Sequence, residues 1–299
     1  MLEDLFDFAL TWRLLELDFV QAALIAAAVL GLVAGVLGPL IVMRKMAFAV
    51  HGTAELAFTG AAAALLLGIG LSYGALAGAV LAALLLGLLG GRDSDRDSVI
   101  GAILSFGLGL GVLLLWLYEG RASNKFGILI GQIVAIDSTD LLTLLIAGGA
   151  VLLVLAVIYR PLLFASLDPA VAAARGVPVA VLSPLFAVLI GVASALGVQI
   201  VGALLVMAVM ITPAAAAARL TASPLRATVL SVIFAEVSAV GGIVLSLAPG
   251  VPVSVFVTMI SFAIYLVCRL IAYLRQRQGR RGAREVTGDG RPTSAAPAG

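Results

Sequence analysis

Residues 20–43 read VQAALIAAAVLGLVAGVLGPLIVM and contain no charged side chain. An α-helix needs about 20 apolar residues to cross the hydrocarbon core of a bilayer, and this run exceeds that length. Hydrophobic residues make up 63% of the 299 residues and charged residues only 11%, whereas soluble domains have about 45–50% and about 25%. The sequence therefore predicts an all-α polytopic membrane protein.

Nine apolar stretches follow one another along the chain. They are residues 20–43, 47–69, 73–91, 98–118, 139–159, 180–198, 199–218, 226–247 and 253–274. Only Gln199 separates the sixth stretch from the seventh, so we expect eight to nine transmembrane helices. If all nine cross, the odd number places the two termini on opposite sides of the membrane.

The basic residues indicate which side is which. Of the 18 lysines and arginines, all but Arg13, Arg121 and Lys125 fall on the side that holds Arg44 and the C-terminus. Cytoplasmic loops carry the excess of basic residues in membrane proteins, so this side is predicted to be cytoplasmic. We therefore expect a multi-pass protein of the cell membrane with its N-terminus outside and its C-terminus in the cytoplasm.

The two ends of the chain differ from the apolar region, residues 20–274. Residues 1–19 alternate apolar and acidic side chains without a basic start, which predicts an interfacial segment rather than a cleaved signal peptide. Residues 275–299 are polar, basic and rich in Gly, Pro and Ala, which predicts a disordered cytoplasmic tail. This tail is either a plain anchor after the last span or a segment that binds anionic membrane lipid.

The stretch MRKMAFAVHGTAELAFTG, residues 43–60, holds the single histidine of the chain, His51, and a glutamate four positions later, Glu55. At 1.5 Å per residue, Glu55 lies roughly 15 Å beyond the interfacial pair Arg44 and Lys45, and His51 roughly 9 Å. The spacing places both side chains on one helical face. Imidazole and carboxylate bind zinc, manganese or iron, so the pair is a candidate metal path. The alternative is a structural hydrogen bond between them.

Glu236 is a second carboxylate within an apolar stretch. It lies ten residues after Arg226, which again gives a depth of roughly 15 Å. Carboxylates at this depth usually face the interior of a helix bundle or an aqueous path. Glu236 is therefore a candidate for the same metal path, with a structural hydrogen bond to a neighbouring helix as the alternative.

Pro213 lies near the cytoplasmic end of the stretch 199–218. A proline inside a helix frees a carbonyl oxygen and kinks the helix axis. The expected kink at Pro213 is either a gate or a packing adjustment.

Glycines four residues apart recur in the apolar stretches. The pairs are Gly31 with Gly35, Gly74 with Gly78, and Gly127 with Gly131. Such pairs let helix backbones approach closely in lipid, so they predict tight helix packing.

The cytoplasmic loop of residues 160–179 contains a short segment with helix-capping residues at both ends. Asp168 suits the N-cap, Pro169 the first helical position and Gly176 the position after the C-cap. Basic side chains flank the segment, and Arg175 is one of them. We interpret it as a docking element for a cytoplasmic partner; a plain connector is the alternative.

Signals for an enzyme are sparse in this chain. The sequence GLSYG matches the serine-hydrolase pattern around Ser72, but it falls in a predicted external turn, on the other side of the midplane from His51. The chain has no Walker-A sequence, so it does not bind ATP by a P-loop. Its one cysteine, Cys268, excludes an internal disulfide and a cysteine-rich metal site.

Three segments together resemble the permeases of ABC importers for zinc and manganese. Residues 43–68 resemble that family's G-D-A-x-S-H-A-x-x-x-G segment, and residues 164–179 are similar to its S-x-D-P-x-x-A-x-x-x-G-V loop. Residues 201–220 resemble its V-G-x-L-L-V-x-A-x-x-x-x-P-A-A-x-A segment, and residues 124–137 its extracytoplasmic segment. The resemblance extends from about residue 20 to residue 274.

The resemblance implies a type II ABC importer permease fold and a homodimer of permeases. It also implies two cytoplasmic ATP-binding subunits and an extracellular metal-binding lipoprotein that delivers the ion. The loop with Asp168, Pro169, Arg175 and Gly176 would dock on the ATPase. No bound cofactor and no nucleic acid are expected, because the metal ion is the cargo.

The sequence departs from the family pattern within the candidate metal path. When residues 43–60 are aligned on Gly60, the family's aspartate falls at His51 and its histidine at Glu55. The two ligand types are therefore present but exchanged. The basic residue that precedes V-G-x-L-L in the family is Gln199 in this chain.

These observations predict the membrane subunit of an ATP-driven importer of a divalent transition metal, with zinc as the expected ion. Manganese and an iron chelate are the alternatives within the same class of importer. A proton-coupled secondary transporter that uses Glu55 and Glu236 as proton sites is a further alternative.

Overall fold

The computed structural model describes residues 8–89, 96–120 and 138–288, and every regular element in these ranges is helical. The elements are α1 (Phe8–Leu15), α2 (Asp18–Met43), α3 (Ala47–Leu67), α4 (Leu71–Leu89), α5 (Arg96–Leu117), α7 (Ser138–Leu167), α8 (Pro169–Ala174), α9 (Val179–Ile200), the 3₁₀ turn η3 (Ala203–Leu205), α10 (Val206–Met210), α11 (Thr212–Leu220), α12 (Pro224–Leu247) and α13 (Val253–Gly288). The all-α class is confirmed. The family-like stretch 124–137 lies outside the described residues.

Seven helices in these ranges are long and apolar enough to cross a membrane: α2, α3, α5, α7, α9, α12 and α13. α4 is shorter, and it corresponds to the stretch 73–91. The stretch 199–218 is not one helix, because it is divided among the end of α9, η3, α10 and α11. The expected count of eight to nine transmembrane helices is not confirmed, because the described residues contain seven full-length candidates and two shorter apolar segments, Leu71–Leu86 and Val206–Leu220.

The break within 199–218 has two local causes. Gly202 has φ +91°, a backbone conformation that a residue with a Cβ rarely adopts, and it separates α9 from η3. Pro213 lies in the first turn of α11, where its missing N–H removes no helical hydrogen bond. Pro213 therefore begins a helix after the break at Ile211, instead of kinking a continuous one.

Glycines bring several helices into close contact. Gly60 of α3 faces Gly74 and Gly78 of α4 with no room for a Cβ, and Gly35 of α2 lies similarly close to Val232 of α12. The predicted packing role of the pairs Gly31–Gly35 and Gly74–Gly78 is thus confirmed. Gly127 and Gly131 lie outside the described residues.

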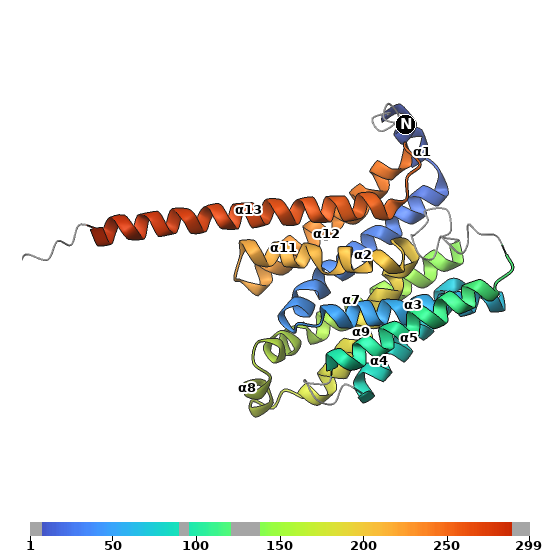
Figure 1. The fold of residues 1–299 in the computed structure, drawn as a ribbon, viewed down its shortest axis with the longest axis horizontal. Helices are drawn as coiled ribbons and strands as arrows, with labels where there is room; N and C mark the ends of the chain where they lie inside the picture. Colours follow the sequence, from blue (N-terminus) through green and yellow to red (C-terminus); the bar gives the residue numbers. More distant parts are fainter. Residues whose placement is uncertain (1–7, 90–95, 121–137, 289–299) are drawn as a thin grey trace, which may run out of the picture.

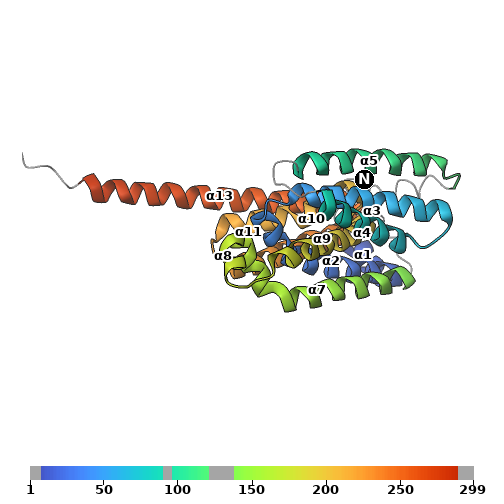
Figure 2. The same ribbon diagram turned by 90° about the horizontal axis from the view of Figure 1, so that it is seen from below.

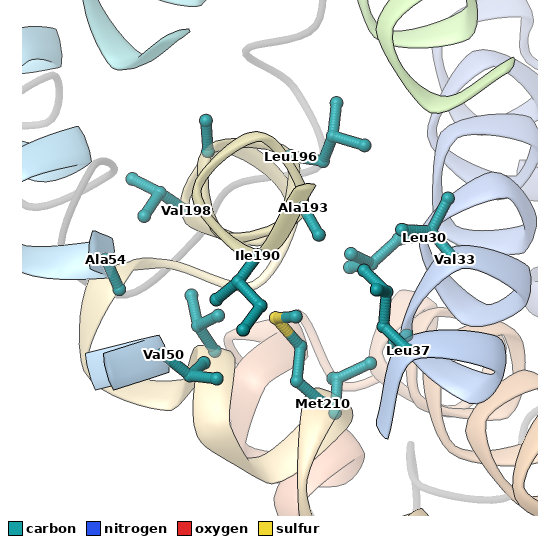
Figure 3. Packing of buried hydrophobic residues seen from close by; sticks show 14 of the residues in the cluster. Leu30, Val33, Leu37, Val50, Ala54, Ile190, Ala193, Leu196, Val198 and Met210 are labelled. Carbon is teal, nitrogen blue, oxygen red and sulfur yellow. The ribbon is translucent and has the colours of Figure 1, made fainter. Parts of the chain in front are cut away.

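The helices pack in layers. α5 covers α3 on one outer face, α7 lies on the opposite face, and α9 and α2 lie between them (Figure 2). In the core, Met210 of α10 lies between Ile190 of α9 and Leu37 of α2, and Val50 of α3 closes the cluster (Figure 3). All four side chains are fully buried. This core fixes α3, α9 and α2 relative to one another.

Hydrogen bonds between helix ends show which ends lie together. Tyr159 Oη and Thr228 Oγ1 lie 2.8 Å apart, which joins the C-terminal part of α7 to the beginning of α12. At the other end of the bundle Ser72 donates to Asp140 Oδ1 at 2.6 Å, which joins the beginnings of α4 and α7. This arrangement agrees with the alternating direction expected of successive spans.

The two ends of the chain are helical where the structure describes them. α1 covers Phe8–Leu15 within the predicted interfacial segment, and α2 begins at Asp18. α13 continues as a helix to Gly288 and projects from the bundle (Figure 1), whereas disorder was expected from residue 275 onward. The arginines and glutamines that follow residue 274 are good helix formers, and this local preference extends the helix.

Candidate metal path and coupling helix

α3 carries both proposed metal ligands, and Glu55 lies on the side of this helix that faces α5. Gly52 approaches Ile100, and a Cβ at Gly107 would lie 3.3 Å from the Glu55 backbone carbonyl carbon and from its Cβ. Glu55 is only 2% exposed, and His51 is half-buried. The absence of side chains at Gly52 and Gly107 lets α5 lie directly over the carboxylate-bearing turn of α3.

The two ionisable groups of α3 keep buried polar atoms without partners. His51 Nδ1 and Glu55 Oε2 have no hydrogen-bond partner among the described residues. In contrast, Thr59 Oγ1 donates to Gly107 O at 2.6 Å, and Thr53 Oγ1 lies 2.8 Å from Ser194 Oγ. Because an unpartnered buried polar group is costly, His51 and Glu55 are the groups of this helix that a ligand would satisfy.

Glu236 lies in a different part of the bundle. It packs against Gly31 of α2, where an added Cβ would lie 2.8 Å from Glu236 Oε1. This oxygen is buried without a partner, and the carboxylate also meets the backbone of Leu32. Glu55 therefore lies between α3 and α5 and Glu236 between α2 and α12, so the structure does not place the two carboxylates in contact with the same helix pair.

The described residues contain no group of three or more His, Cys, Asp or Glu side chains arranged to hold a metal ion. His51 and Glu55, one turn apart, supply one nitrogen donor and one carboxylate. Such a pair can contact a passing cation and release it, because few ligands give a weak site.

The capped segment of the loop 160–179 forms a helix, α8. Asp168 Oδ1 accepts a hydrogen bond from Val171 N at 3.0 Å, and Pro169 occupies the first turn. Gly176 has φ +82°, and the N–H groups of Gly176 and Val177 each donate to carbonyl oxygens of α8 at 3.0 Å. This pattern is a Schellman motif, so both predicted ends of the helix are present.

α8 exposes most of its surface. Ala172 is its one buried residue, and Arg175, which forms the C-cap, is exposed. Val171 is 45% exposed, and Leu167, just before the N-cap, is 62% exposed. Figure 1 shows α8 at the end of the bundle, between the end of α7 and the beginning of α9. An exposed apolar surface on a capped helix is suited to contact with another protein.

Pro213 lies next to a close helix crossing. Gly38 of α2 faces the α10–α11 junction, where an added Cβ would lie 2.7 Å from both Met210 O and Ala214 Cβ. Pro213 itself is buried. The junction is thus packed against α2, and a gating role for Pro213 stays a prediction.

Two polar clusters were not found by sequence reasoning. The first joins Arg44, at the end of α2, to α7 and α9. In the second, Ser72 donates to Asp140 Oδ1 and also contacts Gln199 Oε1, at the end of the bundle opposite Arg44. Ser72 lies beyond the end of α3, roughly 24 Å along the helix from His51, so no Ser–His pair exists. A sequence shows that these side chains are polar, but it does not show which distant residues they meet.

Comparison with known proteins agrees with the fold and with the family resemblance. Residues 16–272 match the profile of the ABC 3 transport family. The chain is 31% identical to the manganese import system permease protein ScaB of Streptococcus parasanguinis, over 86% of this chain and 92% of that protein. It is also 31% identical to the manganese transport system membrane protein MntC of Halalkalibacterium halodurans, over 78% and 80% of the two chains.

Solved structures give the same result. PsaBC from Streptococcus pneumoniae, in complex with Fab, superposes with a TM-score of 0.77 at 30% identity, over 90% of this chain and 95% of that chain. An inward-facing metal-chelate type ABC transporter shares the fold with a TM-score of 0.64 at 16% identity, over 83% and 85% of the two chains. The chain therefore belongs to the ABC 3 transport family and is a membrane-spanning metal-ion permease subunit rather than an enzyme.

Proposed function

We propose that this chain is the permease subunit of an ATP-driven importer of manganese. The proposal rests on the pair His51 and Glu55, each with a buried polar atom that has no partner among the described residues, in a chain whose relatives ScaB and MntC are named for manganese. Zinc was the expectation from the sequence, and the names of these relatives support the manganese alternative instead.

The chemistry of the candidate ligands agrees with manganese. Carboxylate oxygens suit Mn²⁺, whereas sites rich in thiolate and imidazole select Zn²⁺. The pair on α3 supplies one carboxylate and one imidazole, and Glu236 of α12 is a further carboxylate candidate. Cys268 is buried in α13, on a different helix from the candidate pair.

The ion would move along α3 in two short steps. His51 is one turn nearer the Arg44 end than Glu55, so the two groups form a ladder parallel to the helix axis. Each contact is weak because the remaining ligands come from water, backbone or a second copy of the chain. A weak site of this kind lets the ion enter and leave.

Three partners belong to the proposal. A cytoplasmic ATP-binding subunit would dock on α8 through Val171, Arg175 and the capped ends at Asp168, Pro169 and Gly176. An extracytoplasmic metal-binding protein would deliver the ion, and two copies of the permease would form a homodimer. The N-terminus would lie outside the cell and the C-terminus in the cytoplasm, as the distribution of basic residues indicates.

The test is transport by the reconstituted complex. The permease, its ATPase and its metal-binding protein are placed in liposomes, and uptake of radioactive manganese is measured with competing zinc and iron. We expect uptake that requires ATP and that excess manganese, but not equimolar zinc, suppresses. Preferential uptake of zinc would contradict the choice of metal. Uptake without the ATPase that an uncoupler abolishes would instead favour the secondary transporter.

A further inference from the structure

The short link between α2 and α3, residues 44–46, is tied to the helices on both sides of α8. Arg44 Nε donates to Ser166 Oγ at 2.7 Å, and Ser166 Oγ donates in turn to Leu162 O at 2.6 Å. Both residues belong to the last turns of α7. The Arg44 guanidinium also lies over the ring of Phe186 of α9, 4.9 Å from its centroid.

These contacts lie close to α8 in the chain. Ser166 precedes the N-cap Asp168 by two residues, and Phe186 follows the beginning of α9 by two turns. Phe186 is fully buried, so the guanidinium above its ring contacts a side chain that is fixed in place. Any displacement of α8 that carries α7 and α9 with it therefore also displaces Arg44.

The backbone of the link transmits such a displacement to α3. Lys45 has φ +55°, and Met46 N donates to Ile41 O at 2.9 Å while Lys45 N donates to Val42 O at 3.2 Å. These two bonds form a Schellman motif, which fixes the exit of the chain from α2. α3 begins one residue later, at Ala47, and His51 follows within its first two turns.

We propose that Arg44 is a positioning residue that couples movement of α8 to the metal-binding face of α3. The inference rests on the proposed transport function for its cargo, but its structural part, the connection from α8 to α3, does not depend on which ion is carried. Arg44 donates to Ser166 of α7 through Nε and places its guanidinium over the ring of Phe186 of α9. A lysine ammonium has neither the planar face nor the fixed fork.

The simplest alternative role for Arg44 is a positive charge that anchors α2 at the membrane interface. Exposed Lys45 already supplies such a charge next to it. The substitution Arg44→Lys distinguishes the two roles, because it keeps the positive charge and removes the planar guanidinium. If Arg44 is only an anchor, the Arg44→Lys variant should transport normally. If Arg44 couples α8 to α3, the variant should hydrolyse ATP without a matching amount of transport.

The experiment compares Arg44→Lys, Ser166→Ala and the control Arg226→Lys in liposomes that contain the full complex. Arg226 is an exposed arginine in the first turn of α12. We expect Arg44→Lys to lower the ratio of manganese taken up to ATP hydrolysed by about tenfold, a size typical of coupling between sites. Ser166→Ala should lower it less, and Arg226→Lys should leave it unchanged. An unchanged ratio in Arg44→Lys would overturn the inference.

A second measurement does not depend on the cargo. Hydrogen exchange of the assembled complex is followed at α8 and at residues 47–53 before and after ATP binds to the ATPase. In the wild type we expect exchange to change in both segments, and in Arg44→Lys only in α8. If residues 47–53 still respond in Arg44→Lys, the inference is wrong. If the wild type fails to import manganese but shows the linked response, the proposed function fails and the coupling role of Arg44 stands.

Discussion

At the scale of single residues, a left-handed backbone conformation and two side chains with unpartnered polar atoms lie within a short length of this permease. Lys45 adopts a left-handed conformation, while His51 and Glu55, both within the next three turns, keep buried polar atoms without partners. All three lie in or next to α3, so this helix contains both a constrained entry and the candidate metal ligands.

The left-handed conformation of Lys45 predicts an effect on stability. Any side chain with a Cβ, that of Lys45 included, costs about 1–2 kcal/mol relative to glycine in this region, because the Cβ approaches the following carbonyl oxygen. A β-branched side chain is disfavoured further. We expect Lys45→Val to lower the midpoint of thermal unfolding in detergent and Lys45→Gly to raise it or leave it unchanged. Equal midpoints for the two variants would show that the Schellman motif at the end of α2 is not maintained.

The exchange of the two ligand types predicts that their order is not essential. The double variant His51→Asp, Glu55→His restores the order that the resembling permeases have while keeping one imidazole and one carboxylate on one face of α3. We expect ATP-dependent manganese uptake within about threefold of the wild type, since the donor set is the same. The single variant Glu55→His, which leaves two imidazoles, is the control, and we expect it to shift the preference toward zinc.

At the scale of the helix, capping residues stabilise the two ends of α8, and glycines on one face of α5 let it pack closely on α3. α8 has both caps and little buried surface, so its order depends on its capping hydrogen bonds more than on packing. α5 lies over α3 at Glu55 because Gly107 and Gly111 leave room for Glu55 and Phe58. The opposite face of α5 is exposed at Gly101 and Gly109.

The N-cap of α8 predicts a defect in docking. Replacing an N-cap aspartate by alanine costs about 0.5–2 kcal/mol of helix stability. We expect Asp168→Ala to weaken binding of the ATPase by about tenfold, while Asp168→Ser, which keeps a capping oxygen, stays near the wild type. Both affinities can be measured by titrating the ATPase against the permease in detergent. Equal affinities would contradict docking through α8.

The glycines of α5 predict that a leucine substitution destabilises the protein on the face that packs against α3 but not on the exposed face. Gly107→Leu would force a side chain against Glu55 and should destabilise the protein by about 1–3 kcal/mol. Gly109→Leu, two residues away, meets open space and is the matched control. Thermal unfolding in detergent compares the two variants. If both change stability by the same amount, α5 does not pack on α3 as described.

At the scale of the whole molecule, the sequence predicts the helices well because length and hydropathy alone determine whether a segment can span a bilayer. The break at Gly202 was not predicted, since the surrounding residues are uniformly apolar and the break depends on one backbone conformation. The helical extension of α13 was missed because composition indicated disorder, whereas its arginines favour a helix.

The site was predicted only in part. Counting residues gives the depth of a side chain in the membrane, but it does not show which helices surround that side chain. Counting residues from Arg44 and Arg226 gives similar depths for Glu55 and Glu236, but the structure places them against different helices. The caps of α8 were predicted in full, since capping depends on adjacent residues. The contacts of Arg44 with Ser166 and Phe186 could not be predicted, because they join residues far apart in the sequence.

We propose that the buried carboxylate of α3, Glu55, lies on the path of the ion. The most direct measurement is ATP-dependent manganese uptake by complexes that carry Glu55→Ala, with Glu55→Asp as the matched control and co-purification of the ATPase as the check on assembly. We expect Glu55→Ala to abolish uptake while the ATPase still co-purifies, and Glu55→Asp to retain part of it. Normal uptake by assembled Glu55→Ala complexes would contradict the account.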